Sequence, residues 1–183
     1  MDVLRLQTER LELIAANREI VHADRYARNQ LDGLLGARVP GAWPPPLNDN
    51  STLEWILNFI DTHPGATGWS MWYFILSAPA RVAVGLGGFK GAPAEDGSVE
   101  VGYSLLEEYQ RNGYATEATN ELVRWAFGHP GVRQVTAETY PHLKQSIRVL
   151  EKSGFSYIGE SIETLTIRFA LTREEWQHVH STT

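Results

Sequence analysis

The fold of this chain is organised around the stretch of residues 99–127, VEVGYSLLEEYQRNGYATEATNELVRWAF. Its first part alternates apolar and polar residues, which is typical of a strand with one buried face. From Ala115 the apolar residues recur at helical spacing, so the second part predicts an amphipathic helix. The turn between them contains Gly113. A glycine turn at a helix start offers unpaired backbone N–H groups and the positive end of the helix dipole, so the stretch predicts an anion site suited to phosphate or pyrophosphate.

The composition is that of a globular domain, with 183 residues, of which 43% are hydrophobic and 21% are charged. This length suits one domain with a sizeable core, so we expect residues 1–183 to form a single domain. The chain has no Cys, which excludes disulfides, a thiolate metal site and a cysteine nucleophile. The six His show no ligand spacing, so no metal is expected.

Charge and hydropathy patterning also limit the classes of partner. A net charge of −6 disfavours nucleic-acid binding and tolerates a cationic partner such as an amine or a basic protein tail. No apolar run reaches the roughly 18 residues that a membrane span needs. The opening MDVLRLQTERLEL lacks the apolar region of a signal peptide. We therefore expect a cytoplasmic protein that does not engage membranes.

The region before the central stretch predicts strands and helices on either side of a proline-rich break. The expected elements are a kinked strand at 4–13, helices at about 18–30 and 52–62, and strands at 69–76 and 82–89. Asn17 and Ser51 are the expected N-caps, and Glu54 would complete a capping box with Ser51. The break at 36–50 predicts either a rigid surface loop or a wall of the substrate site, with an exposed Trp43 as a plausible contact.

The region after the central stretch predicts a strand, a helix and two closing strands. The expected elements are strands at 132–139, 155–161 and 165–171, a helix at 144–153, and a last turn at 173–176 capped by Thr172.

The residues of the glycine turn resemble motif A of the GNAT superfamily of acyl-CoA-dependent N-acyltransferases. Gln110, Gly113 and Ala115 fill the three specified positions of its pattern, Gln/Arg-x-x-Gly-x-Gly/Ala. Residues 146–155 resemble motif B of the same superfamily. Residues 8–13, TERLEL, resemble the opening strand of the Rim-type subgroup, the ribosomal-protein N-terminal acetyltransferases and their relatives.

The resemblance implies an α/β (α+β) GNAT fold. Its central sheet is mixed and mostly antiparallel, has about seven strands, is splayed at the cofactor site and is flanked by helices. Residues 98–155 would form the acyl-CoA-binding core, and residues 1–97 the acceptor side. The implied enzyme is an acetyl-CoA-dependent N-acetyltransferase. It would transfer the acetyl group to a primary amine, on a protein N-terminus or a small molecule, by direct attack in a ternary complex.

The same resemblance assigns the cofactor contacts. A backbone N–H near Leu105 would polarise the thioester carbonyl. Gly113 would allow the close approach of the pyrophosphate, and Arg111 would add a charge-assisted contact. The residues expected to hold the pyrophosphate, mainly through backbone N–H groups, are Gln110, Arg111, Asn112, Gly113, Tyr114, Ala115 and Thr116.

The catalytic groups are less directly specified. An alkyl ammonium needs a base at neutral pH, and Glu100 is the first candidate, with Glu138 second. The alternative for each is a solvated or salt-bridged strand carboxylate, and a terminal α-amine would need no dedicated base. Ser146 is placed to stabilise the departing thiolate, or simply to cap a helix. Leu150 occupies the position where many GNAT enzymes carry a tyrosine for that role.

Two further alternatives stay open. The motif B asparagine that contacts pantetheine in many members is absent, so either His142 replaces it or backbone groups suffice. A catalytically weak GNAT-fold module that binds or senses CoA is the alternative to the enzyme. The sequence leaves open the acceptor and the oligomeric state, a homodimer being one option.

Overall fold

The computed structural model describes residues 3–161 and 164–180 of the chain. Within them a single sheet has eight strands in the order β1-β2-β3-β4-β5-β6-β8-β7. Only β5 and β6 pair in parallel, and all other neighbours are antiparallel. The strands are β1 (Arg5–Gln7), β2 (Leu11–Ala15), β3 (Met71–Leu76), β4 (Val82–Phe89), β5 (Ser98–Leu105), β6 (Gln134–Thr139), β7 (Ser156–Ser161) and β8 (Thr166–Thr172). The predicted mixed, mostly antiparallel sheet is confirmed.

The additional strand comes from the N-terminus. We expected one kinked strand at residues 4–13, but the chain forms the hairpin β1–β2 there. The Thr8 N–H donates to the Leu11 carbonyl over 2.8 Å and closes the turn. Apolar alternation continues on both sides of a tight turn, so the pattern alone did not separate a kink from a reversal of direction.

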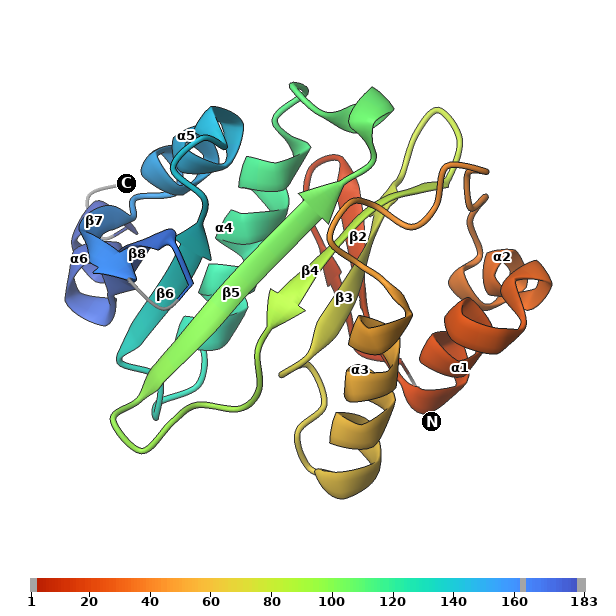
Figure 1. The fold of residues 1–183 in the computed structure, drawn as a ribbon, viewed down its shortest axis with the longest axis horizontal. Helices are drawn as coiled ribbons and strands as arrows, with labels where there is room; N and C mark the ends of the chain where they lie inside the picture. Colours follow the sequence, from red (N-terminus) through yellow and green to blue (C-terminus); the bar gives the residue numbers. More distant parts are fainter. Residues whose placement is uncertain (1–2, 162–163, 181–183) are drawn as a thin grey trace.

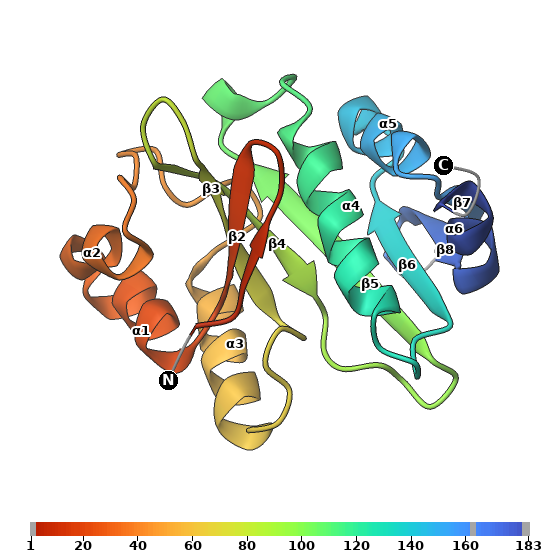
Figure 2. The ribbon, with the colours of Figure 1, turned by 180° about the vertical axis from the view of Figure 1, so that it is seen from behind.

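Helices cover both faces of the sheet. The helices of one face are α1 (Arg18–Tyr26), the short α2 (Leu31–Leu35) and α3 (Asn50–Thr62), which lie beside β2–β4 (Figure 1). The helices of the other side are α4 (Tyr114–Phe127), α5 (Lys144–Lys152) and α6 (Arg173–His180), and Figure 2 shows α4 and α5 in front of β5 and β6. Two apolar cores follow from this arrangement. One lies between α1–α3 and the sheet, and the other between the sheet and α4.

Helix capping was predicted correctly at two helices and wrongly at a third. The Asn17 side chain accepts from the Ile20 N–H at 2.8 Å, as expected for α1. Thr172 caps α6 and accepts from the Glu175 N–H at 3.2 Å. Ser51 is not the N-cap of α3, because Asp49 accepts from the Thr52 N–H at 3.0 Å and the helix begins at Asn50. A carboxylate two residues upstream both caps the helix and matches its dipole, so the box with Glu54 does not form.

The predicted helix at 18–30 is shorter than expected. Helix α1 ends at Tyr26, a 3-10 turn (Arg28–Gln30) follows, and α2, which was not predicted, continues the chain. Gly33 lies inside α2, and such a glycine lowers helix propensity, which concealed this element in the sequence.

The proline-rich break forms a loop, but its tryptophan is buried. Trp43 is 7% exposed and stacks on Tyr73 with ring centroids 6.1 Å apart. Its Nε1–H donates to the buried Asp24 at 3.1 Å. The expectation of an exposed Trp43 was therefore wrong. The loop still lies over the sheet, since the Ser104 hydroxyl of β5 donates to the Pro46 carbonyl at 2.7 Å.

Candidate active site

The start of helix α4 leaves backbone donors open. Gly113 is the N-cap residue, has φ +82° and has no side chain that caps the helix. The Glu117 N–H donates to the Gly113 carbonyl at 3.0 Å, which is the first bond of the helix. The N–H groups of the preceding residues 114–116 therefore point ahead of the helix, where the dipole is positive. Such an arrangement binds anions.

The left-handed backbone explains why glycine occupies this position. A Cβ on Gly113 would lie 3.2 Å from Nη2 of Arg10, and the φ of +82° disfavours L side chains. Arg111, two residues after the end of the short 3-10 turn at Glu107–Tyr109, also has a positive φ of 63°. The turn between β5 and α4 thus folds tightly ahead of the helix, and its surface stays free of a side chain at Gly113.

The β1–β2 turn supports this helix start from behind. The Arg10 guanidinium donates to the Glu117 carboxylate at 2.7 Å and to the Asn112 carbonyl at 2.9 Å, and lies over the Tyr114 ring at 4.6 Å. The Thr8 hydroxyl also donates to Glu117, at 2.6 Å. The short sequence signature at 8–13 therefore has a physical role, because it fixes the first turn of α4.

Glu117 is a site residue that the sequence reasoning missed. Burial by itself would raise the pKa of this carboxyl, but hydrogen bonds from Thr8 and Arg10 outweigh it and lower the pKa below its usual range. The available signal was an acidic residue in the first turn of the motif helix, together with an arginine in the N-terminal signature. Nothing in the sequence indicated that the two meet.

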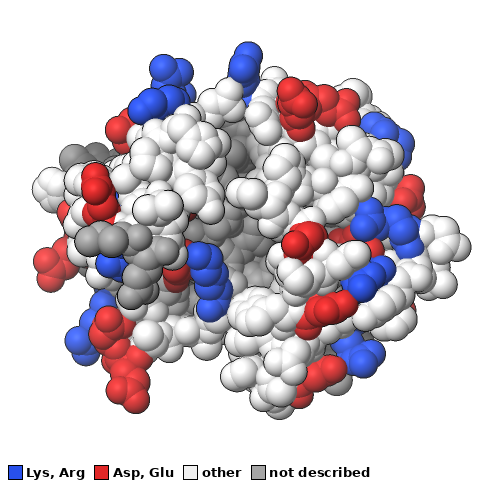
Figure 3. Space-filling view, in the orientation of Figure 1, with Lys and Arg blue, Asp and Glu red and all other residues white. Residues whose placement is uncertain are grey.

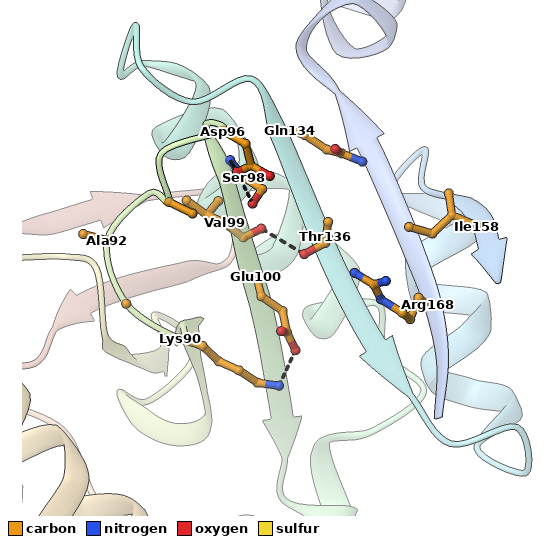
Figure 4. Close-up of a pocket in the computed structure, with 12 residues that line it drawn as sticks. Lys90, Ala92, Asp96, Ser98, Val99, Glu100, Gln134, Thr136, Ile158 and Arg168 are labelled. Carbon is orange, nitrogen blue, oxygen red and sulfur yellow. Dashed lines mark hydrogen bonds and ion pairs between the residues drawn. The ribbon is translucent and has the colours of Figure 1, made fainter. Parts of the chain in front are cut away.

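The sheet opens between β5 and β6. Their parallel pairing covers only Ser98 to Glu100 on β5, opposite Gln134 to Thr136 on β6. Strand β5 then continues to Leu105 and β6 to Thr139 without pairing to each other. Figure 4 shows the two strands moving apart toward their carboxyl ends. The splayed sheet that the resemblance implied is confirmed.

The open part of β5 presents alternate backbone groups to this gap. Leu106 donates to the Val84 carbonyl and Lys90 donates to the Glu100 carbonyl, so the even-numbered residues of β5 face β4. In an antiparallel pair the intervening residues point their N–H and C=O groups the other way. Those residues are Val101, Tyr103 and Leu105. The Leu105 carbonyl accepts from Gln110 Nε2 at 3.2 Å, which leaves the Leu105 N–H directed at the gap.

Helix α5 forms the other wall of the gap and brings Ser146 to Tyr103. The Tyr103 hydroxyl lies 3.0 Å from the Ser146 carbonyl and 3.2 Å from the Ser146 hydroxyl. Burial raises the pKa of Tyr103 to about 12, although its hydrogen bond with Ser146 acts in the opposite direction. Ser146 lies in the first turn of α5 but is not its cap, since the N-cap residue is Leu143. Leu150 is buried in the core, at 1% exposure.

The turn and α5 are also joined by side chains. Gln145 donates to Gln110 Oε1 at 3.2 Å, and its oxygen accepts from Arg111 Nε at 3.1 Å, with the amide orientation chosen by this hydrogen bonding. His142 lies on the exposed approach to α5, where it stacks on Tyr140 with ring centroids 5.6 Å apart. Gln110 and Arg111 of the turn therefore lie against α5 at one end of the gap, and the Arg111 side chain is held by Gln145.

Glu100 lies on the opposite face of the sheet, at the last paired position before the gap. Figure 4 shows its carboxylate beside the Lys90 ammonium, with which it forms an ion pair. Thr136 and Arg168 project from β6 and β8 on the same face, and all four residues line a cavity of about 350 Å³. The space-filling view of this face shows a hollow near its centre, with acidic and basic side chains around it (Figure 3).

Glu138, the second candidate base, is more fully occupied. Its carboxylate accepts from the Thr166 hydroxyl at 2.8 Å and pairs with Arg168 at 3.3 Å. It also lies beyond the paired segment of β6, two residues past Thr136. The Thr164 hydroxyl also donates to this carboxylate, at 3.4 Å. A carboxylate held by three partners has less freedom to accept a proton from an incoming amine.

Two features are absent from the described residues. Residues 3–161 and 164–180 contain no cluster of three or more His, Cys, Asp or Glu arranged to hold a metal ion. Within the same ranges, each helix is too short or too polar to cross a membrane.

Comparison with known proteins agrees with this geometry. The model of the acetyltransferase (GNAT) domain matches residues 10–156. The uncharacterized N-acetyltransferase YjdG of Bacillus subtilis (strain 168) is 28% identical over 160 residues, which cover 86% of this chain and 93% of YjdG. The FsC-acetyl coenzyme A-N(2)-transacetylase of Aspergillus fumigatus is 25% identical over 191 residues, which cover 93% of this chain and 77% of that protein.

A solved structure supports the fold. RimL, the ribosomal L7/L12 alpha-N-protein acetyltransferase in complex with coenzyme A, superposes with a TM-score of 0.67 at 16% identity, covering 92% of this chain and 98% of its own. At this identity the likeness concerns the fold alone. The family match spans most of the chain and includes the splayed strands and the open helix start. This chain therefore belongs to the GNAT family of acetyltransferases, and the enzyme class predicted from its sequence, an N-acetyltransferase, is confirmed.

Proposed function

We propose that this protein transfers the acetyl group of acetyl-CoA to a primary amine, by direct attack of the amine in a ternary complex. The observation that carries the proposal is the meeting of two sets of open backbone donors at one gap. One set lies at the start of α4 and the other on the odd-numbered edge of β5. Acetyl-CoA, an acetyl thioester on a long carrier with a pyrophosphate, has groups that match both sets.

The start of α4 is suited to the pyrophosphate. The N–H groups of residues 114–116 point ahead of the helix, and Gly113 leaves room for a close approach. Gln110, Asn112 and Arg111 complete the proposed cradle, in which Arg111 would exchange Gln145 for a phosphate oxygen.

The edge of β5 is suited to the thioester. The Leu105 N–H faces the gap while the carbonyl of the same residue is held by Gln110. A fixed N–H at this place would stabilise the negative charge that develops on the acetyl oxygen during attack. His142 remains a proposed contact of the carrier chain, at the exposed approach to α5.

Glu100 is our proposed base. It stands at the last paired position of β5, on the face away from α5, so an amine bound in the cavity beside Lys90 would reach the gap from this side. The amine would replace the Lys90 ammonium as partner of the carboxylate before losing its proton. Ser146, on the α5 side, would stabilise the departing thiolate by hydrogen bonding.

The proposed acceptor is an amine of either of two classes, which the similar proteins suggest. RimL is a ribosomal L7/L12 alpha-N-protein acetyltransferase, and a second structural neighbour, from Vibrio fischeri, is a ribosomal-protein-S5-alanine acetyltransferase. The Aspergillus relative is described as an N(2)-transacetylase. A protein N-terminus or a small-molecule amine is therefore the proposed acceptor. The N-terminal region, residues 1–97, would supply much of its binding surface.

The test combines cofactor binding with turnover. Isothermal titration should give micromolar binding of acetyl-CoA, and release of the CoA thiol should follow when a panel of amines and peptides is added. A Gly113→Asp variant should bind acetyl-CoA ~100-fold or more weakly, because it places a carboxylate where the pyrophosphate lies.

Two matched variants separate charge from strain. Asparagine has nearly the same shape as aspartate, carries no charge and also tolerates the left-handed backbone. Gly113→Asn should therefore lose much less affinity for acetyl-CoA than Gly113→Asp. Gly65→Asp, at an exposed glycine with open space around it, should bind like the wild type. No binding by the wild type at millimolar acetyl-CoA would overturn the proposal. Binding without turnover on the whole panel would favour a CoA-binding or sensor module instead.

A further inference from the structure

Tyr103 is a hydroxyl-bearing residue at the gap that the proposed mechanism does not yet use. It lies in the unpaired part of β5, three residues beyond the last residue that pairs with β6. Its side chain projects to the α4–α5 side, and its hydroxyl ends at the first turn of α5. In the sequence, Tyr103 is one apolar position of an alternating strand.

The Tyr103 hydroxyl can change its hydrogen-bond acceptor when a stronger one comes near. A phenol carries a single proton, and both acceptors near it, the carbonyl and the hydroxyl of Ser146, are neutral. An anionic acceptor forms a hydrogen bond roughly twice as strong. A thiolate that formed beside the phenol would therefore take over its proton as a hydrogen bond, while the phenol oxygen could still accept from the Ser146 hydroxyl.

We propose that Tyr103 donates a hydrogen bond to the sulfur of CoA as it leaves, with Ser146 as the second hydroxyl of the same donor pair. This deepens the proposed function and rests on it, since it names the group that stabilises the leaving thiolate. In this step the amine nitrogen forms a bond to the acetyl carbon and the carbon–sulfur bond breaks. The bonding pair stays on sulfur, and the amine proton goes to Glu100 or water.

The chemistry of the phenol fits a donor that keeps its own proton. With a pKa of about 12, Tyr103 is protonated throughout the neutral range and is always available to donate. A thiol ionises near pH 8.5, so full proton transfer from Tyr103 to the thiolate would be unfavourable. The thiolate is instead held by hydrogen bonds and is protonated by solvent after release.

The position supports the same role. The proposed carbonyl donor, the Leu105 N–H, lies two residues further along the same open edge of β5. A sulfur attached to that carbonyl and lying between β5 and α5 is within reach of a phenol that already spans from one to the other. Leu150 cannot take this role, because its side chain is apolar and buried in the core.

The test measures the ionisation of the CoA thiol bound to the protein, using CoA itself and the ultraviolet absorbance of the thiolate as a function of pH. Tyr103→Phe keeps the ring and removes only the hydroxyl. We expect it to raise the pKa of the bound thiol by about one unit relative to the wild type, a tenfold change in ionisation constant. The affinity for acetyl-CoA should change less than twofold, and kcat should fall about tenfold. The dipoles of α4 and α5 act equally in both proteins, so only the difference is interpreted.

Controls and a second variant keep the test decisive. Tyr26→Phe, on the exposed side of α1, should match the wild type in every readout. Ser146→Ala should also raise the pKa of the bound thiol. In the double variant this pKa should rise by less than the sum of the two single rises, because the two hydroxyls act as one unit. If Tyr103→Phe does not fold, Tyr103→Leu, which also removes the hydroxyl and keeps an apolar side chain at this position, provides the same measurement.

Each outcome decides a different claim. An unchanged pKa of the bound thiol in Tyr103→Phe would overturn this inference, whatever the result for Ser146→Ala and whatever the turnover of the wild type. A raised pKa in a wild-type background that acetylates no amine would support the donor pair and refute the proposed function. A loss of acetyl-CoA affinity as large as the loss of kcat would mean that Tyr103 serves binding, and would also overturn the inference.

Discussion

In the N-terminal region, residues 3–97, the buried Asp24 carboxylate is paired with side chains of the protein, whereas in the motif region, residues 98–155, several backbone groups are left open. Asp24 illustrates the first case. It is fully buried and is bonded by the Trp43 indole, the Tyr73 hydroxyl at 3.0 Å and Arg28 at 3.0 Å. The start of α4 and the free edge of β5 illustrate the second case.

In this fold, structural polar groups and functional ones differ in where their hydrogen-bond partners come from. A buried group whose partners all come from the protein holds the fold together. An open donor on a rigid element is available to a ligand. By this criterion the Asp24 cluster fixes the proline-rich loop, through Trp43, and the gap between β5 and β6 is the proposed cofactor site.

The largest expected effect is on the Asp24 cluster. Asp24→Ala should destabilise the protein by about 3–5 kcal/mol, because it leaves Arg28, Trp43 and Tyr73 without their shared partner. Urea unfolding followed by tryptophan fluorescence measures this loss. Under conditions where the variant is folded, its affinity for acetyl-CoA should stay within about threefold of the wild type. A much larger loss of affinity would break the division between the two regions.

The next effect is on catalysis. Glu100→Gln should lower kcat about 100-fold, the usual scale for a lost general base, with little change in acetyl-CoA affinity. Glu138→Gln provides the comparison of the two candidate bases, and we expect its effect to be much smaller because Thr166 and Arg168 already hold that carboxylate. Glu19→Gln, on the exposed side of α1, serves as the neutral control. Equal losses for Glu100 and Glu138 would refute the assignment.

A smaller effect concerns the support of α4. Glu117→Gln should weaken acetyl-CoA binding about tenfold and lower the free energy of unfolding by about 1–2 kcal/mol. The reason is that it removes the anion that holds Arg10 and Thr8 against the helix start. Titration calorimetry and unfolding measurements check the two quantities. Should stability fall while affinity is unchanged, the β1–β2 turn supports the fold and not the cofactor site.

The pH dependence of stability should distinguish the two carboxylates. The pKa of Glu117 is lowered in the folded state, so its contribution is present above the ordinary value of 4.5 and is lost as the pH falls through the folded pKa. Burial raises the pKa of Asp24 above 3.8, although Arg28, Tyr73 and Trp43 oppose that rise. Its contribution therefore has the opposite sign and declines as the pH rises through this range.

Two variants test these signs. The stability deficit of Glu117→Gln should shrink as the pH is lowered from neutral, whereas the deficit of Asp24→Asn should grow. Unfolding free energies at several pH values check both trends. The same slope for the two variants would contradict the contrast between the regions.

The smallest effect is expected at the proline-rich loop, residues 36–50, where it lies over β5. Ser104→Ala removes the hydroxyl that holds the Pro46 carbonyl, and should cost only about 0.5–1.5 kcal/mol of stability. A change in the KM for the acceptor amine, with acetyl-CoA affinity unchanged, would place this loop at the acceptor site. An unchanged KM would assign the loop a structural role only.

Much of the fold could be predicted because local patterns coincide with the elements. The alternation in β5, the helical period of α4 and the caps at Asn17 and Thr172 each depend on residues close together in the chain. The errors also have local causes. Ser51 was chosen as a cap although Asp49 lay nearby, and the β1–β2 turn was taken for a kink within one strand.

The candidate site was predictable only in part. The turn at 110–116 was found because glycine in a left-handed N-cap leaves a local signature. The partners of that turn were not, because Arg10 and Glu117 are far apart in sequence and meet only when β1–β2 packs beside α4. Trp43 was misjudged for the same reason, since its hydrogen-bond partner Asp24 lies in α1 and the ring that stacks on it, that of Tyr73, lies in β3.

By itself, the sequence determined the strand, turn and helix at residues 99–127, because backbone preference and hydrophobic period act over short distances. Only the tertiary structure decided where β6 leaves β5, which backbone groups of β5 stay open, and that Tyr103 meets Ser146. These depend on the register between strands and on the packing of α5, which no local pattern encodes.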